Sequence, residues 1–426
     1  MEYRNMTRGE LETLLAEEKE KYAALKSAGL TLDMSRGVPG RDQLDLSQEM
    51  LSILVTPEDC AGEDGRDYRS YGLPDGTPEA KRMFSYLTGA PAENIIVCGN
   101  SSLNVMFDTV ARNMLLGVSK DSEPWSRQGN IKFLCPVPGY DRHFSICETF
   151  GIEMINIPMT TEGPDMDAVE AAVRDPLVKG IWCVPKYSNP DGITYSDETV
   201  KRFAALKPAA PDFRIFWDNA YIVHDLYDEG DKLLDIFAEC EKYGSTDMVY
   251  MFVSTSKITF PGAGVAAIIA SRSNVEYIKS VMAMQTICHD KLNQLRHAKF
   301  LSSRDKILEH MKKHAALLRP KFKTVCDTLE RELGGTGVAE WNTPRGGYFI
   351  SLNVCDGCAK KVYSLMEELG IKLTPAGATF PYRRDPRDRN LRIAPTYPPI
   401  EELKKAVDAL CVCVKIACIE KILAEK

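Results

Sequence analysis

Two ionisable residues end apolar segments of the chain, and their positions are suited to chemistry. Lys257 follows the apolar run MVYMFVSTS and precedes ITFPGAG, a loop with one proline and two glycines. A lysine at the mouth of a buried strand either extends its ammonium into solvent or has a lowered pKa that lets its amine attack a carbonyl. Asp218 ends the apolar segment FRIFWD, where a carboxylate needs a polar partner or caps a turn or helix. The two residues indicate either a reactive site or two structural roles.

Other polar motifs also follow apolar segments. They are GNSSLN after residues 95–99, PGYDRH after 131–138, KYSNPDG after 180–186, and DNAY and STSK at the ends of 213–221 and 248–254. In GNSSLN, Ser101 and Ser102 either cap a helix or leave its first N–H groups free to hold an anion. Ligands of open α/β sheets bind outside the carboxyl ends of the strands, so all five motifs can face one crevice.

These motifs lie in a pattern of alternating strands and helices. Most of the apolar segments are continuous, as expected for strands that helices bury on both faces. Helical periodicity lies between several of them, which predicts an α/β fold with a mostly parallel, seven-stranded sheet. The seven expected strands fall within residues 95–99, 131–138, 152–159, 180–186, 213–221, 248–254 and 266–272.

The domain organisation follows from the change of pattern near residue 290. From there a long amphipathic stretch runs to Gly334, and Pro320 is expected to divide it into two helices. We expect a large domain over residues 71–300 and a smaller α+β domain over 301–426. Residues 1–70 are expected to pack on the smaller domain, starting with a helix that Thr7 and Glu10 cap.

Composition and charge exclude several classes of protein. The 426 residues carry a formal net charge of −7, which disfavours a nucleic-acid surface. No apolar run approaches about eighteen residues, and the acidic start lacks a signal-peptide pattern, so a cytoplasmic location without membrane contact is expected. The thirteen cysteines are expected to be reduced. Cys355 and Cys358 could form half of a zinc site, but no second pair has suitable spacing, so no metal site is predicted.

Taken in order, the motifs GNSSLN, PGY, SNPDG, DNAY, STSK and LRIAP resemble those of the fold-type I pyridoxal-phosphate enzymes, and among them the class I aminotransferases. SNPDG is similar to that family's Asn-Pro-x-Gly signature, and STSK to its Ser-x-Ser-Lys segment. The resemblance spans about residues 35–400. The stretches YGLPDGTPEAKRMF and STSKITFPGAGVA are most similar to bacterial aspartate/alanine aminotransferases related to MocR-type proteins.

The resemblance implies a role for each matching residue. Lys257 holds pyridoxal 5'-phosphate as a Schiff base and transfers protons, and Asp218 pairs with the pyridine nitrogen. Tyr221 and Asn189 hydrogen-bond the ring oxygen, and Tyr140 stacks on the ring. Gly37, Asn189 and Arg392 bind the substrate, with Arg392 on the α-carboxylate. The phosphate group is expected to contact Ser101, Ser102, Leu103, Ser254, Ser256 and, from the other subunit of a homodimer, Tyr71.

One position departs from the family pattern. These enzymes usually carry a phosphate-binding arginine after the lysine, and here Gly264 takes its place in a loop that is one residue shorter. The expected reaction moves an amino group from L-aspartate, or alanine, to 2-oxoglutarate by a ping-pong mechanism. A distal carboxylate needs a second cation, for which Arg36 and Arg345 are candidates.

Two alternatives remain open at this point. A pyridoxal-phosphate-dependent β-C–S lyase would use the same lysine, aspartate and stacking tyrosine. A cofactor-binding regulator is disfavoured, because the segment before DMSRG is too short for a winged helix-turn-helix domain.

Overall fold

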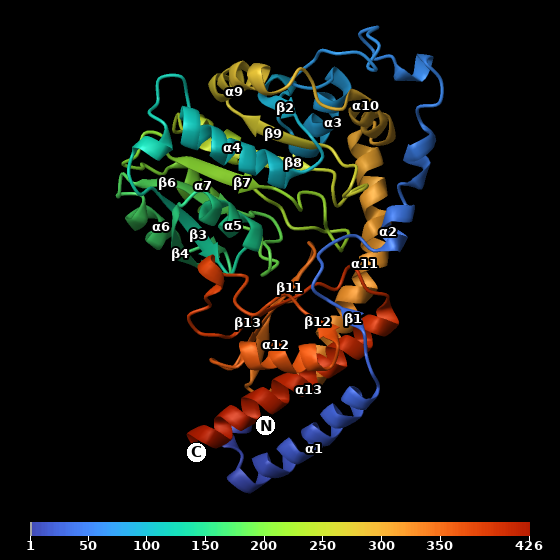
Figure 1. The fold of residues 1–426 in the computed structure, drawn as a ribbon, viewed down its shortest axis with the longest axis vertical. Coiled ribbons are helices and arrows are strands. Elements are labelled where there is room, and N and C mark those ends of the chain that lie inside the picture. The colour runs from blue at the N-terminus through green and yellow to red at the C-terminus, as the bar shows by residue number, and fades with distance from the viewer. Residues whose placement is uncertain (1) are drawn as a thin grey trace.

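The computed structural model describes residues 2–426, and an eight-stranded mixed sheet lies at its centre (Figure 1). The strands lie in the order β2-β9-β8-β7-β6-β3-β4-β5. β3, β4, β6, β7 and β8 are parallel neighbours, whereas β2, β5 and β9 pair antiparallel. The strands are β2 (Ile95–Val97), β3 (Lys132–Val137), β4 (Glu153–Thr160), β5 (Gly163–Pro164), β6 (Val178–Cys183), β7 (Arg214–Asp218), β8 (Val249–Ser254) and β9 (Ala266–Ala270).

This sheet confirms the predicted α/β class and the mostly parallel arrangement. All seven predicted strands are present, and the two-residue strand β5 adds an eighth at the edge. Four of the strands, β6, β7, β8 and β9, are buried along nearly their whole length, as their continuous apolar sequences predict.

Helices cover both faces of the sheet. One face packs on α4 (Ser102–Leu116), α5 (Asp141–Thr149) and α9 (Arg272–Gln285). The other packs on α3 (Pro78–Thr88), α6 (Met166–Ala172), α7 (Asp197–Ala204), α8 (Ile236–Glu241) and the start of α11 (Arg304–Leu333). Because successive side chains of a strand point to opposite faces, Phe216 packs on the first face and Trp217 on the second. Asp218, the next residue of β7, therefore points to the α4 and α5 side.

A separate core lies around the C-terminal helix α13 (Ile400–Glu425) and unites both ends of the chain (Figure 1). α13 packs against α1 (Arg8–Ser27), α12 (Ala359–Glu368) and the second half of α11. Beside it lies an antiparallel sheet of β10 (Ala339–Trp341), β11 (Ile350–Val354) and β13 (Asn390–Ile393). β1 (Leu32–Asp33) pairs with β12 (Ile371–Lys372), and α2 (Arg41–Asp45) contacts α11. The domain boundaries expected near residues 70 and 300 stay a prediction.

The capping prediction is confirmed, and the prediction at Pro320 is wrong. Thr7 and Glu10 form a reciprocal capping box at the start of α1. Pro320 lies inside one continuous helix, α11, with Leu318 and Phe322 buried on either side of it. Proline removes one backbone hydrogen bond from the helix, and burial of this apolar face offsets that loss, so the helix continues. The break occurs earlier, after α10 (Lys291–Phe300), where Ser303 caps the start of α11.

None of the helices in residues 2–426 is long and apolar enough to cross a membrane.

Candidate active site

A cavity of about 150 Å³ lies at the carboxyl ends of β7 and β8 and gathers most of the predicted site residues. Its wall includes Gly37, Ser101, Ser102, Leu103, Tyr140, Asn189, Asp218, Tyr221, Ser254, Ser256 and Lys257. These residues come from four strand-to-helix connections, from the connection between β8 and β9, and from the segment after β1. The expectation that the five polar motifs face one crevice is therefore met by the geometry.

Lys257 lines this cavity, and its amine lies near two aromatic rings. Its Nζ is 5.1 Å from the ring centre of Tyr221 and 5.9 Å from that of Tyr348. Burial lowers the pKa of Lys257 below its ordinary value, the charge of Arg392 lowers it further, and the Asp218 carboxylate opposes both. A larger fraction of this amine is therefore neutral at a given pH than for a lysine in water. The neutral amine is the form that can attack a carbonyl or accept a proton.

Asp218 presents one carboxylate oxygen to the cavity while the other is held in place. His143 Nε2 lies 3.0 Å from Asp218 Oδ2, and both side chains are buried. The His143 ring stacks on Trp182 with 4.4 Å between ring centres, which fixes its orientation. Asp218 Oδ1 is buried and has no hydrogen-bond partner among residues 2–426. A buried, unpartnered carboxylate oxygen is costly, so this atom indicates a cationic or N–H group supplied by a ligand.

Hydroxyl groups and a helix N-terminus form the end of the cavity near α4. Ser101 precedes the first turn of α4, and its side chain does not cap the helix. Ser254 Oγ donates to Ser256 Oγ at 3.2 Å, and Ser256 Oγ donates to the Asn100 carbonyl at 3.2 Å. The free N–H groups of a 15-residue helix together with these hydroxyls favour an anion.

Gly264 lies directly against this anion-binding end. A Cβ on Gly264 would lie 3.1 Å from the Asn100 carbonyl oxygen and 3.3 Å from the Ser256 nitrogen. The carbonyl of Gly264 accepts a 2.9 Å hydrogen bond from Asn293 Nδ2 on α10. A side chain at this position would require the Asn100 carbonyl or the Ser256 backbone to move by a few tenths of an ångström, so the loop is closely packed around the glycine.

Arg392 of β13 lies beside the cavity and is already held by four groups. Its Nη1 donates to Asp141 Oδ1 at 2.9 Å and to Asn189 Oδ1 at 3.2 Å. Its Nε donates to Thr374 Oγ1 at 3.3 Å, and its guanidinium lies 4.8 Å from the Phe349 ring centre. The side chain is buried, and two of the residues that it contacts, Asn189 and Phe349, line the cavity.

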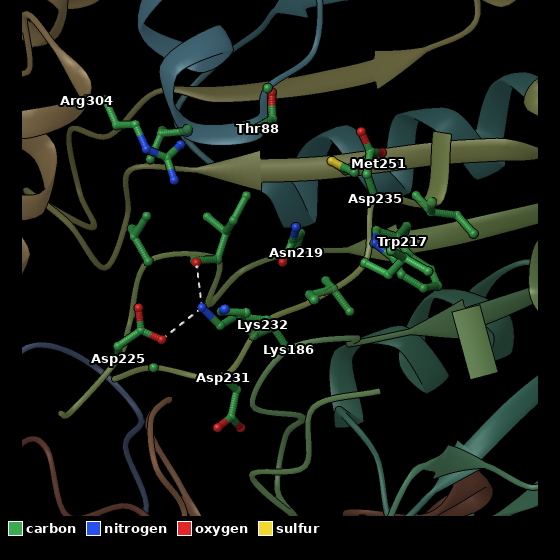
Figure 2. A pocket seen from close by; sticks show the side chains of 18 of the residues that line it. Thr88, Lys186, Trp217, Asn219, Asp225, Asp231, Lys232, Asp235, Met251 and Arg304 are labelled. Atoms are coloured by element: carbon green, nitrogen blue, oxygen red, sulfur yellow. Dashed lines mark hydrogen bonds and ion pairs between the residues drawn. The ribbon is translucent and has the colours of Figure 1, made fainter. Parts of the chain in front are cut away.

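A larger cavity of about 510 Å³ lies on the opposite face of the sheet (Figure 2). Trp217 and Asn219, the neighbours of Asp218, line it because alternate residues of β7 point to opposite faces. Lys186 is paired there with Asp225 at 2.8 Å and with the Ile222 carbonyl at 3.1 Å. The residues of 2–426 that form its wall include none of those predicted to bind the cofactor.

Two predicted residues lie outside the smaller cavity. Arg392 contacts its wall as described, and Tyr71 is 81% exposed on this chain. Arg345, a candidate for the distal carboxylate, instead pairs with Asp231 at 3.2 Å, a residue of the larger cavity. Arg36 is exposed beside Gly37 and lies 5.6 Å from the Tyr397 ring centre.

The cavity also contains residues that the sequence did not reveal. Met106, Val184, Ala220 and Phe349 complete its wall. Val184 and Ala220 adjoin predicted motifs, so their positions could have been inferred. Phe349 comes from the distant segment before β11, and nothing local in the sequence marks it. His143, at the end of the PGYDRH motif, contacts Asp218 directly.

The residues present fit the cofactor that the sequence motifs imply. An amine and an unpartnered carboxylate oxygen face one cavity that also carries an anion-binding end. Residues 2–426 contain no group of three or more histidine, cysteine or acidic side chains that could hold a metal ion.

Comparison with known proteins gives the same family. Residues 6–426 match the family described as "Aspartate amino-transferase". An aspartate aminotransferase of Corynebacterium glutamicum is 45% identical over 402 residues, covering 94% of this chain and 93% of the relative. A putative aminotransferase of Mycolicibacterium smegmatis is 43% identical over 428 residues, covering 100% of both chains.

Solved structures agree with this match. A crystal structure of an aspartate transaminase from Corynebacterium glutamicum has a TM-score of 0.96 at 43% identity, covering 99% of both chains. An α-aminoadipate aminotransferase from Thermus thermophilus, complexed with N-(5'-phosphopyridoxyl)-L-leucine, shares the fold with a TM-score of 0.72 at 19% identity, covering 93% of this chain and 94% of that one. This chain belongs to the aspartate aminotransferase family and is an aminotransferase that uses pyridoxal phosphate.

Proposed function

We propose that this enzyme transfers the amino group of L-aspartate to 2-oxoglutarate in a ping-pong cycle. The observation that carries the proposal is one small cavity that Lys257, Asp218 and Asn189 line, with Arg392 bonded to Asn189 at its wall. The aspartate aminotransferase of Corynebacterium glutamicum, 45% identical, supports the choice of amino donor.

The cofactor is held at three points. Lys257 would provide its covalent attachment, Asp218 would pair with the pyridine nitrogen, and the hydroxyls and N–H groups near α4 would bind its phosphate. When bound, pyridoxal phosphate supplies an aldehyde for the amino group and a ring that accepts electrons from the substrate Cα. Tyr140 would stack on the ring, and Tyr221 and Asn189 would hydrogen-bond its oxygen.

His143 acts through Asp218. By contacting Oδ2, it fixes the carboxylate so that Oδ1 faces the pyridine nitrogen. The Asp218 charge then stabilises a proton on that nitrogen, which strengthens the ring as an electron acceptor.

Lys257 moves the proton of the reaction. Its lowered pKa makes the neutral amine available as a base at the substrate Cα, and the resulting ammonium can return the proton as an acid. The rings of Tyr221 and Tyr348 stabilise the charged amine, because the face of an aromatic ring attracts a cation.

Arg392 binds the substrate α-carboxylate. Its pairs with Asp141 and Asn189 and its stacking on Phe349 fix the guanidinium before substrate arrives. Gly37 completes this wall, since a Cβ there would overlap the Phe349 ring. We assign the distal carboxylate of aspartate to Arg36, because Arg345 is engaged by Asp231.

The proposed assembly is a homodimer. Tyr71 is 81% exposed on a single chain, as expected for a residue that reaches the phosphate in the other subunit. Its hydroxyl would supply a side-chain hydrogen-bond donor to the phosphate, which Gly264 cannot provide. The cytoplasmic location expected from the sequence stays a prediction.

A panel of amino donors with 2-oxoglutarate tests this function. We expect L-aspartate to have the highest kcat/KM and Lys257→Ala to abolish turnover of every donor. Lys186→Gln serves as the control, since Lys186 is buried in the other cavity and should leave turnover nearly unchanged. A different preferred donor would contradict the substrate assignment, and turnover by Lys257→Ala would contradict the site.

A further inference from the structure

Two neighbouring cysteines and a third that is distant in sequence meet where α13 passes the loop after β11. Cys355 and Cys358 lie in the loop between β11 and α12, and Cys418 lies on α13. The sulfurs of Cys355 and Cys418 are each 3.7 Å from the same acceptor, the carbonyl oxygen of Val338. The Cys358 sulfur lies 3.7 Å from the carbonyl of Ala417, the neighbour of Cys418. Cys355 and Cys358 are close enough to Cys418 to raise the pKa of its thiol.

Only one of the three thiols is open to solvent. Cys355 is half-buried, whereas Cys358 is 2% and Cys418 is 0% exposed. Cys355 lies in the wall of a surface cavity of about 390 Å³. A small oxidant can therefore reach Cys355 first, with the other two sulfurs behind it.

The cavity around Cys355 is rich in charged side chains. Its basic residues are Arg4, Arg387, Arg389 and Lys421, and its acidic residues are Glu340, Asp356 and Glu425. Ion pairs join Arg387 to Asp356, Arg389 to Glu340, and both Arg4 and Lys421 to Glu425.

The charges and hydrogen bonds assign different roles to the thiols. The hydrogen bond from Cys418 lowers the pKa of Cys355 to about 7, with burial opposing this and the charges of Arg4 and Lys421 assisting it. The pKa of Cys418 is raised, because its proton is shared with the other two sulfurs and the site is buried. At neutral pH, a substantial fraction of Cys355 is thus the nucleophilic thiolate, and Cys418 stays protonated beside it.

We propose that Cys355 is an oxidation site for peroxides and that Cys418 is its resolving thiol. In the first step the Cys355 thiolate attacks one peroxide oxygen, the O–O bond breaks, and with one proton the products are Cys355 sulfenic acid and water or an alcohol. In the second step the Cys418 sulfur attacks Cys355, the S–O bond breaks, and the thiol proton and hydroxide leave as water. The two thiols are oxidised by two electrons, and the peroxide is reduced by two.

The resulting disulfide would join α13 to the end of β11. β11 pairs with β13 in a register that places Ser351 opposite Arg392, so the cross-link lies in the same small sheet as the carboxylate-binding arginine. None of the three cysteines lines the active-site cavity, so this oxidation site is separate from transamination.

Peptide mapping of the full-length holoenzyme tests the proposal. The enzyme is treated with one equivalent of hydrogen peroxide, remaining thiols are alkylated, and the digest is analysed without reduction. We expect a Cys355–Cys418 cross-linked peptide that lacks two hydrogen atoms, and its loss in Cys355→Ser. In Cys418→Ser, a sulfenic acid should be trapped at Cys355 by dimedone. Cys60→Ser is the matched control, because Cys60 is also half-buried and contacts only the Thr56 carbonyl through its sulfur.

A second measurement on the unmodified sequence does not depend on how the variants fold. Alkylation of Cys355 followed against pH should have its midpoint at about 7, rather than about 8.5 as for an ordinary thiol. The proposal is overturned if Cys355 is oxidised no faster than Cys60, if the link forms between Cys358 and Cys418 while Cys355 stays reduced, or if the alkylation midpoint is ordinary.

Discussion

Replacing Arg392 by lysine tests how the enzyme binds the substrate carboxylate. The guanidinium uses Nη1 for Asp141 and Asn189 and Nε for Thr374, and it stacks on Phe349. A lysine ammonium is a single point charge that cannot keep the Asp141 pair and also present two parallel donors to a carboxylate. The variant therefore loses a charge-assisted hydrogen bond of about 1.5–3 kcal/mol and a stacking contact of about 0.5–2 kcal/mol.

These contributions sum to about 2–5 kcal/mol, which corresponds to a fall in kcat/KM of roughly 30- to 4,000-fold. The assay measures initial rates against L-aspartate at saturating 2-oxoglutarate. Because the carboxylate is bound before and during the reaction, most of the loss should appear in KM.

Arg389→Lys provides the matched control for this variant. Arg389 directly precedes β13 and pairs with Glu340 at 2.8 Å, a carboxylate that is 80% exposed. A pair with one exposed partner contributes about 0–1 kcal/mol, so kcat/KM should change less than about fivefold. The cofactor absorption of both variants confirms that the site is loaded. If Arg392→Lys stays as active as Arg389→Lys, Arg392 does not bind the carboxylate.

Three further predictions follow from the site. Asp218→Asn should raise the cofactor Kd about 10- to 150-fold, as expected for the loss of a charged hydrogen bond of about 1.5–3 kcal/mol; an unchanged Kd in equilibrium dialysis would exclude the pyridine contact. Burial lowers the pKa of Lys257 below 10.5, so the unfolded chain binds more protons and the cofactor-free enzyme gains stability as pH rises. Lys257→Met should therefore have a higher Tm than the unmodified enzyme at neutral pH, and this difference in Tm should decrease towards pH 10.5. A Tm difference that does not depend on pH would refute this reasoning. Gly37→Ala should displace Phe349, at a cost of about 1–3 kcal/mol, and raise KM for aspartate. Gly62→Ala, which overlaps Tyr68 outside the cavity, should destabilise the fold without affecting KM.

The main parts of the fold and site could be predicted because they depend on local sequence. Strands buried on both faces leave continuous apolar segments, and parallel strands place their carboxyl ends at one edge of the sheet. Asp218 and Lys257 follow adjacent strands, β7 and β8, so their proximity follows from the strand order alone.

Other features depend on contacts between distant segments. Phe349 enters the cavity only because β11 packs near the segment that contains Gly37. His143 lies one helical turn beyond the PGY motif, and its contact with Asp218 depends on how α5 packs on the sheet. Periodicity along the chain does not encode such distances.

The predicted break at Pro320 and the interpretation of Cys355 and Cys358 both depended on contacts that local sequence does not reveal. Local propensity predicts a break at Pro320, but burial of Leu318 and Phe322 keeps α11 continuous. Cys355 and Cys358 resemble half of a zinc site, yet the third member of their cluster, Cys418, lies 60 residues after Cys358 on another helix.

The absorption spectrum of the purified holoenzyme tests the central claim most directly. It is recorded alone, after excess L-aspartate, and again after excess 2-oxoglutarate. Our account predicts a near-visible cofactor band that aspartate removes and 2-oxoglutarate restores. A band that aspartate leaves unchanged would contradict the proposed donor, and no band even after adding pyridoxal phosphate would contradict the role of Lys257.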